Sequence, residues 1–177
     1  MSELPSVFIT NGISSISKER FMDIKNIHNK PIGGLWASEY KEDSELYSDW
    51  IEWCCSQMTS MINKDSVVFS LKDDANILII DSLDDYLKIR DKYTFTKTFM
   101  DETDYHLDFE ILSKEYDGVF LTNNGVRECC GAELMFTVGR CLFGWDVSSL
   151  LLFNLDCIDK WEYKEIDMER LKSYFRE

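Results

Sequence analysis

Histidine, proline and glycine are scarce in this chain of 177 residues, which contains two, two and eight of them respectively. Two histidines cannot build a histidine-rich metal site, and Cys129, Cys130 and Cys141 lack the paired spacing that wraps a zinc ion. The adjacent Gly33 and Gly34 are not followed by a lysine at the offset of a P-loop, and they form no dinucleotide-binding glycine motif. We therefore expect no bound metal and no phosphate loop of the common kinds.

Long hydrophobic runs and a basic N-terminal segment are also missing. No run approaches the ~18 apolar residues that a membrane helix needs, so we expect no membrane span. The opening residues, MSELPSVFIT, contain no basic region followed by a long apolar stretch, so no secretory signal is expected. The six cysteines are then expected to be reduced thiols of a cytoplasmic protein.

Positive charge is in short supply, because 19 lysines and arginines stand against 33 acidic residues and give a net charge of −14. This excess repels phosphate backbones and anionic membrane surfaces, which argues against non-specific nucleic-acid binding. Two interpretations of this excess of acidic residues stay open. It keeps a small aromatic-rich protein soluble, or it forms a face that docks on a basic partner protein. Segments 39–45 (EYKEDSE) and 101–110 (DETDYHLDFE) are the candidates for such a face.

The apolar pattern predicts one compact α+β domain over residues 1–177, since 45% apolar content is ample for one core. The predicted strands cluster along the chain and do not alternate regularly with helices. We expect strands at 6–10, 32–38, 66–71, 76–81 and 119–122 and one or two within 142–155, with 66–71 and 76–81 forming a hairpin or neighbouring strands. We expect helices at 46–61, at 83–93 with Ser82 as N-cap, at 109–118 and at 166–177. Residues 17–27 are expected to form a weak helix or an ordered loop, and residues 94–104 a loop.

Three separated motifs carry a resemblance. The first is PIGGLWAS (31–38), followed by WIEWC (50–54), the second is EYDGVFLT (115–122) and the third is SSLLLFNLDCI (148–158). Together they resemble small ADP-ribosyltransferase-like proteins of microbes and phages. In those, a strand of glycine, aromatic, small residue and serine or threonine leads into a helix carrying a "WA" or "WC" pair. A "YDG" strand and a late apolar strand follow in the same order.

The resemblance implies a cleft between two small, mostly antiparallel sheets flanked by helices, with nicotinamide adenine dinucleotide (NAD) bound in it. Gly33 and Gly34 would let a strand lie close against a flat ring, and Trp36 or Trp50 would supply an aromatic wall. Ser38 falls at the serine or threonine step of the family.

Two positions depart from the family pattern. A first-strand histidine or arginine there holds the adenosine-side ribose, and a late glutamate bonds the nicotinamide ribose and stabilises an oxocarbenium-like transition state. In this chain the first-strand position falls at Thr10 or Asn11, and the glutamate position falls on Ser149. The nearest acids, Asp146 and Glu133, are the candidate catalytic residues.

Each of these residues also has a structural reading, because tryptophans are often core residues and a glycine pair often marks a bulge. Three hypotheses about function follow. The chain is an ADP-ribosyltransferase-like enzyme or nucleotide-binding relative, or a non-catalytic acidic immunity or anti-defence protein that binds a basic partner. The third is a cysteine-dependent enzyme, which requires a lowered thiol pKa at Cys129 or Cys130.

Overall fold

The computed structural model describes residues 3–27, 30–99, 102–131, 142 and 144–175, and it confirms the α+β class. The strands are β1 (Phe8–Asn11), β2 (Leu35–Glu39), β3 (Asp65–Leu71), β4 (Ile77–Ile80), β5 (Thr94–Phe99), β6 (Glu102–Leu107), β7 (Gly118–Leu121), β8 (Ser149–Leu152) and β9 (Ile158–Glu165). The helices are α1 (Asp49–Gln57), α2 (Leu83–Lys92), α3 (Phe109–Leu112), α4 (Asn123–Cys129) and α6 (Met168–Leu171), with 3-10 turns η1 (Thr59–Met61) and η2 (Lys172–Tyr174).

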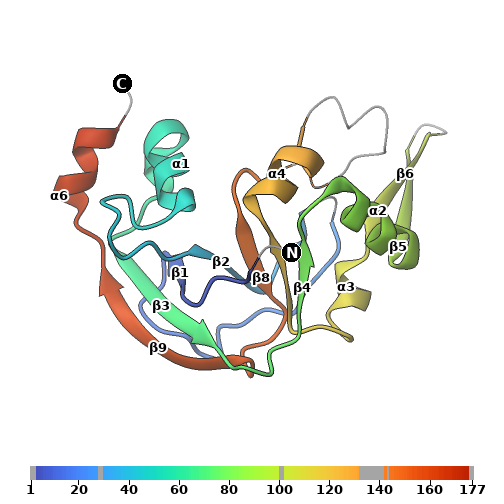
Figure 1. Cartoon of the computed structure of the whole chain (residues 1–177), viewed down its shortest axis with the longest axis horizontal. Coiled ribbons are helices and arrows are strands. Elements are labelled where there is room, and N and C mark those ends of the chain that lie inside the picture. The colour runs from blue at the N-terminus through green and yellow to red at the C-terminus, as the bar shows by residue number, and fades with distance from the viewer. Residues whose placement is uncertain (1–2, 28–29, 100–101, 132–141, 143, 176–177) are drawn as a thin grey trace.

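Seven strands form one curved sheet in the order β4-β7-β8-β2-β1-β3-β9, and β5 and β6 form a separate two-stranded sheet (Figure 1). All neighbouring strands of the large sheet are antiparallel except β4 and β7. The shortest pairing lies in the middle of the sheet, where β1 and β2 pair through only Phe8↔Glu39 and Ile9↔Ser38. The two parts expected to form the cleft are therefore halves of one sheet that meet at this short pairing.

Helices lie above both halves of the sheet and leave space between them (Figure 1). Over one half, Ile51 of α1 and Leu171 of α6 pack on Ile9 and Val68 of the sheet. Over the other half, α2, α3 and α4 cover β4, β7 and β8 in a cluster that contains the fully buried Trp145. A third cluster, around Phe8, Phe69 and Phe120, fills the opposite face of the sheet. The helix-bearing face therefore carries two separate hydrophobic clusters, one on each half of the sheet.

Local sequence signals account for the helix starts. Ser48 and Ser82 have extended backbones and act as N-caps. The hydroxyl of each accepts a hydrogen bond from the backbone N–H three residues later in the chain. The acidic residues Asp84 and Asp85 follow in the first turn of α2, where they complement the helix dipole. The prediction of a helix capped by Ser82 is confirmed. Within the described residues, no helix is long and apolar enough to cross a membrane.

The predicted pairing of residues 66–71 with 76–81 is wrong. β3 lies between β1 and β9, whereas β4 forms the opposite edge of the sheet and pairs in parallel with β7. A strand of continuous apolar residues such as β4 is suited to burial between helices in a parallel pair, and its sequence does not specify which strand it will pair with.

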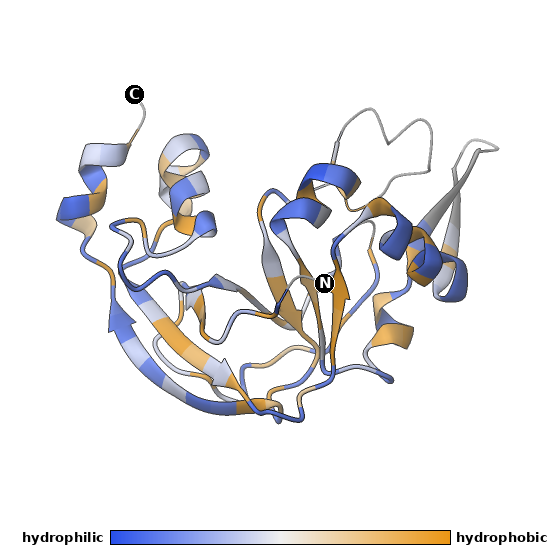
Figure 2. Cartoon of the chain, in the orientation of Figure 1, coloured by the Kyte–Doolittle hydropathy of each residue, from blue (hydrophilic) through white to orange (hydrophobic). Residues whose placement is uncertain are grey.

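Several predicted boundaries also change. Residues 94–99 and 102–104 belong to the antiparallel strands β5 and β6 and not to a loop, and β9 was not predicted at all. The sequence of β9, IDKWEYKE, is mostly exposed at the sheet edge and lacks the apolar run that signals a buried strand (Figure 2). The helix predicted at 109–118 is limited to α3, and residues 17–27 contain no helix. The closing helix consists of α6 and the turn η2.

Candidate functional site

A pocket of about 300 Å³ opens on the helix-bearing face, between its two hydrophobic clusters. Its floor comes from β1 and β2, one wall from α1 and η1, and the facing wall from the segment that leads into β8. The lining residues are Ile9, Thr10, Asn11, Lys30, Trp36, Ala37, Ser38, Trp50, Met61, Asp146, Val147 and Ser149.

Most of the residues singled out from the sequence meet in this pocket. Of the nine, seven line it: Thr10, Asn11, Trp36, Ser38, Trp50, Asp146 and Ser149. Gly34 does not line it, and Glu133 lies outside the described residues. Residues separated by more than a hundred positions in the chain are therefore brought to one place by the pairing of β1 with β2 and of β2 with β8.

The floor of the pocket is tied to the neighbouring strands by polar side chains. Ser38 is buried, and its hydroxyl donates a hydrogen bond to the carbonyl of Ser148 at 3.3 Å. The Asn11 amide donates to the Asn63 carbonyl at 2.5 Å and to the Ser66 hydroxyl at 2.8 Å, and its oxygen accepts the Asn63 backbone N–H. Asn11 thus fastens the chain before β3 to the end of β1. Thr10 is almost fully buried, and strand alternation turns its side chain to the face of Phe8, away from the helices.

Aromatic side chains form two sides of the pocket, and each has a second ring behind it. Trp36 meets the buried Trp145 edge to face, with ring centroids 4.7 Å apart. Trp50 stacks on Trp53 of the same helix at 5.2 Å and an interplanar angle of 14°. Because Trp36 and Trp50 are only half-buried while their partners hold them in place, both rings present fixed apolar surface to the pocket.

Two charged residues lie at the exposed side of the pocket, Asp146 and Lys30. The Lys30 ammonium donates to the Gly144 carbonyl at 3.1 Å and lies 4.8 Å from the centroid of the Trp36 ring. Burial of the ammonium end lowers the pKa of Lys30, and the nearby Asp146 carboxylate acts in the opposite direction. Sequence reasoning missed Lys30, although it directly precedes the PIGGLWAS motif.

The glycine pair of that motif has a structural reason of its own. Gly33 and Gly34 have φ values of +85° and +67°, a region that residues with a side chain rarely adopt. A Cβ at Gly33 would lie 2.2 Å from the Asp23 carbonyl oxygen, and one at Gly34 would lie 2.6 Å from the Leu152 carbonyl oxygen. The close approach made possible by Gly34 is therefore to β8 and the residue 22–24 segment, and not to a bound ring.

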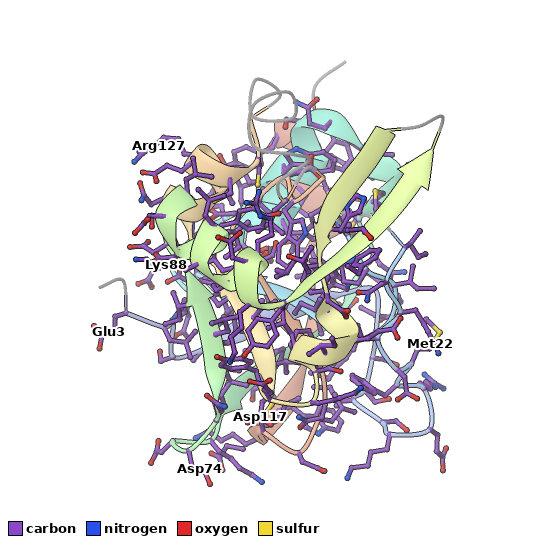
Figure 3. The ribbon with its side chains drawn as sticks, turned by 90° about the vertical axis from the view of Figure 1, so that its right-hand side faces the viewer. Glu3, Met22, Asp74, Lys88, Asp117 and Arg127 are labelled. Atoms are coloured by element: carbon purple, nitrogen blue, oxygen red, sulfur yellow. The ribbon has the colours of Figure 1, made fainter. Side chains whose placement is uncertain are left out.

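The YDG motif is likewise explained by packing. The Asp117 carboxylate accepts hydrogen bonds from the Asn76 backbone at 2.9 Å and from the Asn154 amide at 2.8 Å, so it joins the start of β4 to the end of β8. Asp117 and Asp74 lie at the end of the molecule opposite Arg127 of α4 (Figure 3). A Cβ at Gly118 would lie 2.7 Å from the Leu151 carbonyl oxygen. This motif holds strands together away from the pocket.

Cys54, Cys55 and Cys157 do not carry the lowered thiol pKa of a nucleophile. Burial is the main cause that raises the pKa of Cys54 and of Cys157 to about 11, and it raises the pKa of Cys55 as well. His106 is buried, and the neighbouring Asp108 caps α3 by accepting the Ile111 N–H at 3.0 Å. Cys141 lies outside the described residues. Within the part of the chain that the structure describes, no group of three or more histidine, cysteine and acidic residues is arranged to hold a metal ion.

No protein-family model, curated protein sequence or solved structure matches the chain.

Proposed function

We propose that the chain is an ADP-ribosyltransferase-like protein that binds NAD or a related nucleotide in the pocket between β1, β2, α1 and the start of β8. One observation carries the proposal. Seven residues chosen from the sequence for that role, on four separate stretches of the chain, line the same pocket.

The chemistry of the lining suits a nucleoside. Trp36 and Trp50 offer flat apolar surface for a ring, and the hydroxyl of Ser149 offers a hydrogen bond to a sugar. A volume of about 300 Å³ is at the lower end of the range for ligand pockets. The enclosed part would therefore hold one nucleoside half of the dinucleotide, while the other half extends along the exposed side.

Asp146 is the residue to which we assign the electrostatic role in transfer. Cleavage breaks the bond between the nicotinamide nitrogen and the ribose C1′, and its electron pair leaves with nicotinamide. Positive charge then develops on the ribose, and a carboxylate nearby stabilises it until an acceptor nucleophile adds to C1′. Asp146 is the carboxylate among the described lining residues, so ADP-ribose transfer to a macromolecular acceptor is the reaction that this site would support.

Calorimetric titration with NAD and with ADP-ribose tests the binding proposal. We expect saturable binding by the natural protein and a loss of about tenfold or more in affinity for Trp36→Ala and Asp146→Ala. Trp161→Ala and Asp159→Ala are the matched controls, because both residues are exposed on β9 and do not line the pocket. Equal affinities in all five proteins, or no heat and no thermal shift at millimolar ligand, would contradict the proposal.

A second candidate function is a non-catalytic acidic protein that binds a basic partner. It is favoured by the exposure of Glu42, Asp43 and Glu45 within segment 39–45, on a chain with a net charge of −14. In the other acidic segment, 101–110, the side chains of residues 101–105 lie outside the described ones, Asp108 is buried and Glu110 is exposed. Exchanging the three exposed acids for glutamine would weaken salt-sensitive binding to a lysine-rich test peptide under this hypothesis, and it would leave NAD titrations unchanged.

A further inference from the structure

The side chain of Lys30 lies against the aromatic wall of the pocket, which the sequence around Lys30 does not predict. It is the cation among the lining residues that the structure describes, on a chain that carries 14 more acidic than basic charges. Its residue is exposed overall, but its ammonium end bends over the aromatic wall. A lysine with only a solubilising role would extend into water, where its side chain has the most freedom.

The contacts of the ammonium fix where an anion would bind. Lys30 Nζ donates to the Gly144 carbonyl at 3.1 Å and lies 4.8 Å from the Trp36 ring centroid. An ammonium group has three N–H donors, and the bond to Gly144 uses one of them. An anionic group that accepts from Lys30 would therefore lie beside the Trp36 wall.

The affinity of the pocket for an anionic ligand depends strongly on the charge of Lys30. The excess of acidic residues disfavours any anion that approaches, although charges farther away than ~8 Å are largely screened at physiological salt. Asp146 is also in the pocket and would repel a phosphate, so a cation within contact distance is needed to offset it.

We propose that Lys30 binds a phosphate group of the nucleotide in this pocket and so makes the site select phosphorylated ligands over nucleosides. This inference rests on the proposed function, since it presupposes a nucleotide against Trp36. Burial lowers the pKa of Lys30, and a bound phosphate would act on that pKa in the opposite direction. Lys30, the aromatic wall and the Asp146 carboxylate would then contact three different parts of one ligand.

The test is a set of titrations of four proteins with ADP-ribose and with two phosphate-free ligands, adenosine and nicotinamide riboside. The proteins are the natural chain, Lys30→Gln, Lys30→Arg and the control Lys25→Gln. Lys25 is an exposed lysine of the same segment that does not line the pocket. We expect Lys30→Gln to weaken ADP-ribose binding about tenfold or more, because it removes a charge-assisted hydrogen bond, while nucleoside binding is not weakened. Lys30→Arg should keep most of the ADP-ribose affinity and Lys25→Gln all of it.

Two results would overturn the role of Lys30 and leave the proposed function standing. One is ADP-ribose binding by Lys30→Gln that equals that of the natural protein. The other is an equal loss for ADP-ribose and for the nucleosides, which would make Lys30 a support for the Trp36 wall and not a phosphate contact. Failure of the proposed function appears differently, as a folded natural protein that binds neither ADP-ribose nor NAD, and it would remove this inference as well.

Discussion

Replacing Gly34 by alanine tests the reason for the glycine pair that precedes β2. The alanine would have to adopt φ +67°, which costs an L-residue about 1–2 kcal/mol. Its Cβ would also lie 2.6 Å from the Leu152 carbonyl oxygen and 2.6 Å from Leu151 Cδ1, and forcing a methyl group into a packed site costs about 1–3 kcal/mol. We therefore expect Gly34→Ala to lower the free energy of unfolding by about 2–5 kcal/mol.

Gly12 provides the matched control. Its φ is +97°, but a Cβ there would meet no atom within 4 Å. Gly12→Ala should accordingly lose only the backbone contribution of about 1–2 kcal/mol. Urea denaturation followed by circular dichroism measures both variants, and the difference between their unfolding free energies isolates the contact with β8. Equal losses in the two variants would refute the packing explanation for Gly34.

Two further predictions concern residues outside the pocket. Asp117→Ala should lower the free energy of unfolding by about 1–3 kcal/mol, because it leaves two hydrogen-bond donors unpaired. The control Asp74→Ala, at an exposed residue of the same end of the molecule, should change the free energy of unfolding little. Indistinguishable urea midpoints for the two variants would contradict this prediction. Cys54 and Cys157, whose pKa is about 11, should have roughly one thousandth of their thiols ionised at pH 8, so alkylation in the folded protein should be slow, rise with pH and become fast in urea. Rapid labelling of either cysteine in the folded protein, detected by peptide mass spectrometry, would show that it is activated.

Short apolar runs and helix-capping residues in the sequence were enough to predict some of the strands and helices. The buried strand β7 and the capped start of α2 follow from short apolar runs and from Ser82, and both were identified from sequence. The strands β5, β6 and β9 were missed, since their sequences have mixed polarity and no long apolar run. The partner of β4 could not be predicted either, because strand pairing depends on contacts between distant segments.

The candidate pocket was predicted better than the roles of its residues. The resemblance grouped Trp36, Trp50 and Asp146, and the structure brings them together. It did not indicate that the side chain of Asn11 is held by Asn63 and Ser66, or that Gly34 packs on β8. Such roles depend on neighbours from other strands.

Lys30 escaped notice for a related reason. A single lysine in an irregular segment has no periodic signal, and its value to the site arises only when the fold brings it over Trp36. Sequence motifs therefore identified the aromatic and hydroxyl lining of the pocket, while its positive charge became visible only in three dimensions.

The measurement that tests the central claim most directly is the calorimetric titration of the purified protein with NAD, repeated on Trp36→Ala and on the control Trp161→Ala. We predict saturable binding that is lost in Trp36→Ala and kept in Trp161→Ala. A folded natural protein that gives no heat at millimolar NAD, or a Trp36→Ala variant that binds as well as the natural protein, would contradict the assignment of this pocket to a nucleotide.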